Sequence, residues 1–203
     1  MAELAVGLLV VYFALAFGLR SLVQKRRTGS TGFRGISGAP GLAEWLGGVS
    51  FIAAVGMGLL APILDLAGLL NAIDPLDGRA AHIAGIALFS AGLIATLVAQ
   101  MAMGDAWRIG VAPDERTHLV TAGPFALVRN PIFSGMLPTS LGLALLVPNV
   151  VALAGLVALV SALEIQVRLV EEPHLRRIHG PDYEAYASQV GRFFPGVGQL
   201  RRH

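Results

Sequence analysis

The sequence predicts an all-α integral membrane protein with five transmembrane helices, of which the last two form a tight helical hairpin, followed by a cytoplasmic helical tail. Two observations carry this prediction. Hydrophobic residues make up 55% of the 203 residues and charged residues only 14%, whereas an average soluble chain carries roughly 25% charged residues. Long apolar runs recur along the whole chain, so we expect a single membrane domain that covers residues 1–203.

The first three apolar runs occupy residues 4–23, 46–70 and 80–103. Each is long enough to span a bilayer, because about 20 helical residues cross the ~30 Å hydrocarbon core. The first run lacks a basic segment before it and a small-residue cleavage motif after it, which favours an anchor over a signal peptide. Residues 28–41, rich in Gly, Ser and Thr, and the acidic residues 71–79 are predicted to be loops.

The fourth and fifth apolar runs occupy residues 132–147 and 150–170. Pro148 and Asn149 alone separate them. So short a break between two helices predicts a tight hairpin.

The distribution of basic residues predicts the orientation. With five spans and the N-terminus outside, fourteen of the fifteen Lys and Arg residues lie on the inner side and only Arg79 lies outside, as the positive-inside rule requires. Residues 104–131 and 171–203 then share the cytoplasmic side. One lysine against fourteen arginines indicates a GC-rich genome, so we expect a bacterial inner (plasma) membrane.

The stretch from Leu119 to Gly135, LVTAGPFALVRNPIFSG, lies between two apolar runs but is not itself typical of a membrane span. It contains two glycines, two prolines, an arginine and an asparagine. Such residues make bends and polar contacts. The stretch is therefore expected at the membrane edge or in a pocket.

The end of the fifth run places ionisable residues at helical spacing. Positions i, i+4, i+7, i+8 and i+11 share one helix face, and they hold Glu164, Arg168, Glu171, Glu172 and Leu175. Ionisable groups at membrane depth are functional candidates. An interfacial Glu164–Arg168 ion pair beside two solvated glutamates explains the pattern equally well, so both interpretations stay open.

Other aromatic and polar residues allow more than one interpretation. Tyr183 and Tyr186 are either site residues or anchors of an interfacial helix, on which Arg192 would face lipid phosphates. Gln100 either lines a cavity or hydrogen-bonds to a neighbouring helix. Trp107 is expected in the interfacial aromatic belt.

Composition excludes several classes of function. The absence of cysteine excludes disulfides, thiolate metal sites and a cysteine nucleophile. His118, His174 and His179 lack ligand spacing with a fourth group, so we expect no metal site. The net charge is only +2, and no basic cluster is interleaved with aromatic residues, so we expect no nucleic-acid partner.

The order of these motifs resembles the membrane methyltransferases related to isoprenylcysteine carboxyl methyltransferase and phospholipid methyltransferase. Their pattern is T-x-G-P-Y-x-x-x-R-H-P-x-Y-x-G, a hairpin, E-E, and F-G-x-x-Y-x-x-Y ending in R-x-x-P. This chain has LVTAGPFALVRNPIFSG, a hairpin, EE, and HGPDYEAYASQVGRFFP, so the match covers roughly residues 119–195. Asn130 stands where the family has histidine, and Phe133 where it has tyrosine.

The resemblance implies S-adenosylmethionine as methyl donor, bound on the cytoplasmic side between the loop before the fourth span and the tail after the fifth. The cofactor-binding residues that it implies are Gly123, Pro124, Phe125, Arg129, Asn130, Pro131, Phe133, Gly135, Glu171, Glu172 and Tyr183.

These residue types suit methyl transfer, which depends mainly on positioning and needs neither a metal nor a covalent nucleophile. The two glutamates can hold the cofactor's ammonium or ribose hydroxyls, and Arg129 its carboxylate. Phe125 and Phe133 can face the sulfonium. Arg168 is the candidate anchor for an anionic acceptor, and Glu172 the candidate base for a thiol or amine.

We therefore expect a methyltransferase that acts on a lipophilic or membrane-delivered acceptor. The alternatives are an NADPH-dependent reductase of the sterol or steroid type, and a small transporter or scaffold in which Glu164, Arg168 and Gln100 line a pathway. The acceptor stays open between a prenylcysteine-type carboxylate, a phospholipid amine, a quinone-like hydroxyl and a small thiol. The use of a base and the oligomeric state also stay open.

Overall fold

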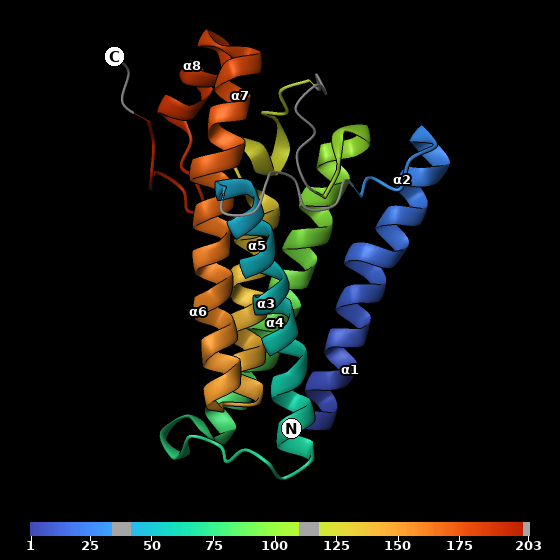
Figure 1. Ribbon diagram of the computed structural model, residues 1–203, viewed down its shortest axis with the longest axis vertical. Helices are drawn as coiled ribbons and strands as arrows, with labels where there is room; N and C mark the ends of the chain where they lie inside the picture. Colours follow the sequence, from blue (N-terminus) through green and yellow to red (C-terminus); the bar gives the residue numbers. More distant parts are fainter. Residues whose placement is uncertain (34–41, 110–117, 201–203) are drawn as a thin grey trace.

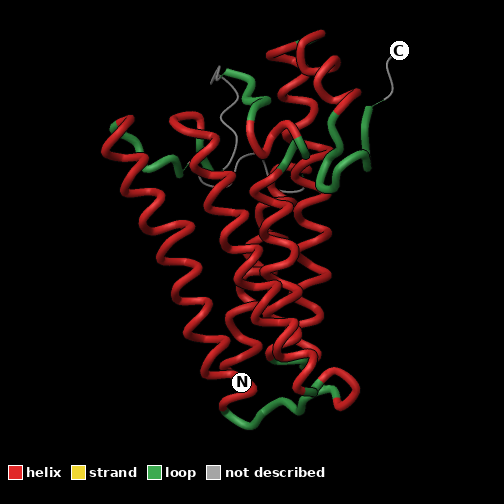
Figure 2. Tube along the Cα trace, turned by 180° about the vertical axis from the view of Figure 1, so that it is seen from behind, coloured by secondary structure: helices red, strands yellow, loops and turns green. Residues whose placement is uncertain are grey.

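The computed structural model describes residues 1–33, 42–109 and 118–200, and this part of the chain is a bundle of helices joined by loops. The helices run along the long axis of the molecule, and the loops gather at its two ends (Figures 1 and 2). The segment between α3 and α4 lies at one end, and α7 and α8 lie at the other (Figure 1).

The first helix is continuous but changes its winding. It begins as α1 (Ala2–Phe13), passes through the π-helical η1 (Ala14–Leu19) and continues as α2 (Arg20–Thr28). It ends at Gly29, whose φ of 78° lies in the left-handed region that glycine adopts without steric cost.

The next two helices are α3 (Ala43–Leu66) and α4 (Arg79–Met103), and the loop between them contains the short η2 (Asp74–Leu76). α4 is followed by a single 3-10 turn, η3 (Gly104–Ala106).

The expected hairpin is formed by α5 (Pro131–Leu146) and α6 (Val150–Ile165), which confirms that prediction. Asn149 closes it from both sides. Its side-chain oxygen accepts from the Ala152 backbone N–H at 3.0 Å, as an N-cap residue does. Its Nδ2 donates to the Ala61 carbonyl at 3.1 Å, which ties the turn to α3.

α4 and α5 approach each other through glycine. A Cβ atom on Gly92 would lie 2.3 Å from Thr139 Oγ1, and one on Gly142 would lie 2.5 Å from the Gly85 carbonyl oxygen. Neither space admits a methyl group, so small residues determine the close packing of these two helices.

Beyond α6 the helix continues without a break through the π-helical η5 (Gln166–Glu171) into α7 (Glu172–His179). Gly180, with a φ of 49°, ends it, and α8 (Pro181–Gln189) turns away. The last helices thus carry the chain out of the bundle and fold it over one end (Figure 1).

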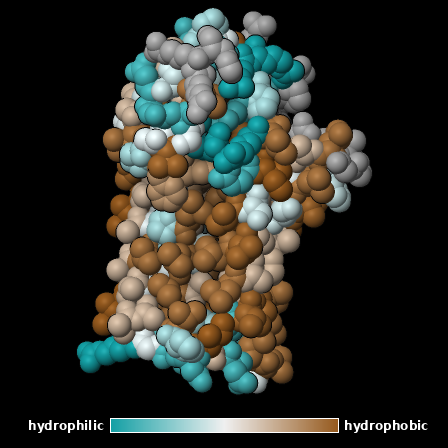
Figure 3. Space-filling model, turned by 90° about the vertical axis from the view of Figure 1, so that its left-hand side faces the viewer, coloured by the Kyte–Doolittle hydropathy of each residue, from teal (hydrophilic) through white to brown (hydrophobic). Residues whose placement is uncertain are grey.

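Within the described ranges, four helices are long and apolar enough to cross a membrane: Ala2–Thr28, Trp45–Leu66, Arg79–Ala106 and Val150–His179. The fifth expected span corresponds to α5, a shorter apolar helix of 16 residues. A broad apolar band covers the face seen in Figure 3, with hydrophilic surface at both ends. The protein is therefore an all-α integral membrane protein.

Candidate active site

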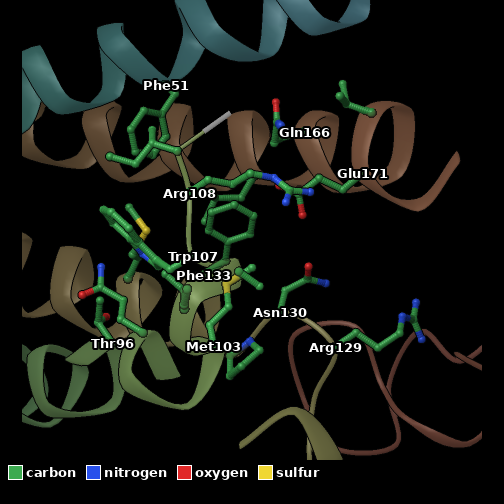
Figure 4. A pocket seen from close by; sticks show the side chains of 18 of the residues that line it. Phe51, Thr96, Met103, Trp107, Arg108, Arg129, Asn130, Phe133, Gln166 and Glu171 are labelled. Atoms are coloured by element: carbon green, nitrogen blue, oxygen red, sulfur yellow. The ribbon is translucent and has the colours of Figure 1, made fainter. Parts of the chain in front are cut away.

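A cavity of about 660 Å³ opens inside the bundle, within the range of roughly 300–1,000 Å³ that ligand pockets occupy. Its lining combines side chains from the helices with those of η4 (Gly123–Ala126), of the loop that follows it and of α8. Figure 4 shows its two ends: Glu171 and Arg108 lie at one, and Thr96 at the other. The cavity therefore joins a charged end to an apolar interior.

The loop before α5 and the tail after α8 lie side by side. Val128 and Gly191 form a parallel β-bridge. The Arg129 N–H donates to the Gly191 carbonyl at 2.8 Å, and the Asn130 N–H donates to the Arg192 carbonyl at 3.1 Å. The two segments, far apart in sequence, form one wall of the site.

Glu172 binds this wall to α7. Its Oε1 accepts from Arg129 Nη2 and from Arg192 Nε, each at 2.7 Å, and its Oε2 accepts from Arg192 Nη2 at 3.0 Å. The side chains of Arg129, Glu172 and Arg192 are 2%, 8% and 11% exposed. Two guanidiniums against one carboxylate leave this buried cluster with a net charge of +1.

Arg129 also holds the tail directly. Its Nη1 donates to the carbonyls of Ala187, at 3.0 Å, and Val190, and its Nη2 donates to the carbonyl of Gly198 at 3.0 Å. Its Nε is buried with no hydrogen-bond partner among the described residues. One donor of this guanidinium is therefore left over at the cavity wall.

The side chains of Glu171 and Glu172 point in different directions from the helix axis, because consecutive helical residues lie about 100° apart around it. Glu171 lines the cavity. Its side chain and that of Arg108 point toward each other, while Arg129 points away toward the tail (Figure 4).

His174 adds a hydrogen-bond donor to the charged end. Its side chain is buried, its ring lines the cavity, and Arg177 Nη2 lies 3.1 Å from its Nδ1. Since arginine only donates, Nδ1 must accept, and the neutral ring then carries its proton on Nε2. That Nε2 is buried and has no partner in the described part of the chain.

Two tyrosines of α8 complete this end. Tyr183 is 1% exposed, and the Tyr186 hydroxyl donates to the Phe125 carbonyl at 2.6 Å, which fixes α8 against η4. Burial raises the pKa of both phenols to about 12, so both stay neutral at physiological pH.

Most of the cofactor-binding residues expected from the sequence meet at the cavity. Those that line it are Phe125, Arg129, Asn130, Pro131, Phe133, Glu171, Glu172 and Tyr183. Gly123, Pro124 and Gly135 lie outside its lining. Gly123 begins η4 with a φ of 61°, and a Cβ atom on Gly135 would lie 2.6 Å from Thr96 Oγ1, so Gly135 belongs to the contact between α4 and α5.

Arg168 lies outside the cavity. It pairs with Glu164, and the two side chains are 56% and 37% exposed. The prediction of a single stripe from Glu164 to Leu175 is wrong, because η5 winds as a π-helix, whose wider turn shifts all later residues around the axis. The ion pair expected as the alternative is present.

Several residues at or beside the cavity have places in the structure that were not expected from the sequence. Trp107 is 2% exposed, and the Arg20 guanidinium carbon lies 4.6 Å from its ring centroid, so its placement in the aromatic belt is wrong. Arg192 is buried against Glu172 rather than facing lipid. The R-x-x-P motif at the end of the family pattern could have predicted Arg192 as a site residue. Arg108 and His174 had no comparable signal.

Comparison with known proteins adds three findings. A family model described as phospholipid methyltransferase matches residues 80–182. The nickel-cobalt-cadmium resistance protein NccN of Alcaligenes xylosoxydans xylosoxydans is 28% identical over 116 residues, which are 57% of this chain and 53% of that protein. This chain thus spans about half the length of that curated relative.

The third finding is a solved structure of the eukaryotic intramembrane Ras methyltransferase ICMT (isoprenylcysteine carboxyl methyltransferase). It aligns with a TM-score of 0.66 and 19% identity over 95% of this chain and 64% of that chain. At this identity the likeness shows a shared fold.

Proposed function

The chain belongs to the phospholipid methyltransferase family, whose members use S-adenosylmethionine, and from this membership we propose that it transfers a methyl group from that cofactor to a lipophilic acceptor delivered from the membrane. The observation that carries the proposal is the cavity. It joins charged and hydrogen-bonding groups of the loop and tail to aromatic and aliphatic side chains between the helices. A polar cofactor and an apolar acceptor need such a pair of environments in contact.

The topology that we propose has five spans, with α5 as the short fourth one, the N-terminus outside, and the loop and tail in the cytoplasm. The positions of the basic residues support it. So does the structure's placement of the segment between α3 and α4 at the end opposite α7 and α8 (Figure 1).

The charged end fits the cofactor. S-adenosylmethionine supplies an electrophilic methyl group on a sulfonium when bound. Its carboxylate matches the net positive cluster and two buried donors, Arg129 Nε and His174 Nε2, which have no partner among the described residues. Its positive groups match Glu171, which lines the cavity, and the ring of Phe133.

The structure changes the roles that we assign to the two neighbouring glutamates. Both oxygens of Glu172 accept hydrogen bonds from arginines, so we assign it to holding the site together. A carboxylate acceptor is already ionised near pH 7 and needs no base. For an acceptor that must lose a proton, we assign the role of the base to Glu171. We assign no role in the reaction to Arg168, which lies at the exposed surface.

Ligand titration tests the proposal. We expect S-adenosylhomocysteine, and not NADPH, to raise the unfolding temperature of the purified protein. Glu171→Gln should weaken S-adenosylhomocysteine about 10- to 100-fold, the cost of losing a hydrogen bond to a charged group. Glu164→Gln, at the exposed ion pair on the same helix, should leave the affinity unchanged.

The alternatives make different predictions in the same titration. Stabilisation by NADPH alone would identify a reductase. If neither ligand binds, a transporter or scaffold is favoured and the methyltransferase proposal fails.

A further inference from the structure

The apolar end of the cavity contains a polar cluster that the proposed cofactor site does not use. Tyr12 of α1 and Thr96 and Gln100 of α4 all line the cavity, and their side chains are 5%, 1% and 2% exposed. Phe13, Phe17 and other aromatic side chains line the same part. Polar groups in such surroundings need partners.

The amide of Gln100 has a defined orientation. Its Nε2 donates to the Ala16 carbonyl at 2.9 Å, and because a carbonyl only accepts, this bond shows which end of the amide is the nitrogen. The Oε1 atom is then turned to the other side. It is buried and has no hydrogen-bond partner within the described residues.

Thr96 leaves a second group unused. Its Oγ1 faces the phenol of Tyr12, yet it reaches hydrogen-bond geometry with no described residue. The cluster therefore offers one oxygen that only accepts, on Gln100, and two hydroxyls that both donate and accept.

We propose that this cluster binds a hydroxyl group of the methyl acceptor, so that the acceptor is a lipophilic alcohol or phenol rather than a plain hydrocarbon chain. An O–H group matches the cluster because it donates to Gln100 Oε1 and accepts from Thr96 or Tyr12. A hydrocarbon would leave Oε1 unpaired, and an ionised group would lie in an apolar site without an opposite charge. The aromatic walls favour a ring beside the hydroxyl.

The inference rests on the proposed function, because a methyl acceptor exists only if the protein transfers methyl groups. Thr96 and Glu171 lie at opposite ends of the cavity (Figure 4). The hydroxyl bound here is therefore a recognition group, separate from the atom that receives the methyl group at the charged end.

Tryptophan fluorescence tests this inference without a turnover measurement. The chain has two tryptophans, and Trp107 lines the cavity, so a Trp45→Phe background leaves Trp107 as the reporter. In lipid nanodiscs, 4-octylphenol should bind about tenfold more tightly than 4-octylanisole, which has the same ring and chain but lacks the O–H.

Thr96→Val and Tyr12→Phe should each reduce that preference severalfold, and having two variants keeps the test valid if one does not fold. Thr139→Val is the matched control, because the Thr139 hydroxyl donates to the Gly135 carbonyl of its own helix at 2.9 Å. It should leave the preference intact.

Equal binding of the two probes, or a preference that none of the cluster variants changes, would mean that the cluster binds only water and would overturn the inference. Titration with S-adenosylhomocysteine in parallel separates the two proposals. Cofactor binding without a phenol preference refutes the hydroxyl site alone. A phenol preference without cofactor binding supports the hydroxyl site and refutes the methyltransferase function.

Discussion

At the scale of single residues, the carboxylate of Glu172 joins three segments: α7, the loop that carries Arg129 and the tail that carries Arg192. Removing its charge leaves two guanidiniums buried beside each other. We expect Glu172→Gln to lower the free energy of unfolding by roughly 3–5 kcal/mol, as removal of one partner from a buried ion pair does. Chemical or thermal unfolding in detergent measures the change.

Glu164→Gln is the matched control, because it removes the same charge from an exposed pair two turns earlier on the helix. Its cost should stay within about 1 kcal/mol. Equal losses for the two variants would show that the buried cluster is not what fastens the tail.

At this scale, the sequence predicted part of the site. Arg129 and the two glutamates were expected at the site from the motif. The motif did not show which glutamate binds the two arginines, because the two are chemically identical neighbours. That division depends on the rotation of the helix, which η5 changes.

At the scale of elements, contact between α4 and α5 supports the floor of the cavity, since Thr96 and Gln100 lie on α4 and Phe133 on α5. We expect Gly92→Ala to destabilise the protein by several kcal/mol, because its new methyl group would lie 2.5 Å from the Gly135 carbonyl oxygen, and overpacking of this kind costs typically 1–3 kcal/mol or more. The free energy of unfolding in detergent and the affinity for S-adenosylhomocysteine should both decrease.

Gly56→Ala provides the control within a helix, since a Cβ atom there meets nothing within 4 Å. It should be neutral or stabilising by up to about 1 kcal/mol, because alanine favours the helix. A tolerated Gly92→Ala would instead show that the two helices can separate without loss.

The helices were predictable where the sequence indicates their ends. The apolar runs and the Pro148–Asn149 break predicted the helices and the hairpin. The π-helical turns η1 and η5 were not predicted, because a hydrophobic pattern is interpreted with 3.6 residues per turn and one wider turn leaves little trace in it.

At the scale of the whole molecule, the proposed topology places the segment between α3 and α4 outside and α8 inside. The chain has no cysteine, so single cysteines report on each side without background. In intact cells, Asn71→Cys should react with a membrane-impermeant maleimide, whereas Ala185→Cys should react only after permeabilisation.

Both positions are exposed, so access from the aqueous phase does not require unfolding. The reverse result would invert the orientation. Labelling of both cysteines from the same side would mean that α5 does not span the bilayer.

The shared wall of loop and tail has a consequence for synthesis. Arg192 follows Glu172 by 20 residues, an interval of about 1–4 s at a ribosomal rate of roughly 5–20 residues per second. During that time Glu172 has one arginine partner already made, Arg129, and still lacks the other. The tail is therefore the last part of the site to be made, and in the proposed topology its arrival on the cytoplasmic side completes the wall of the cavity.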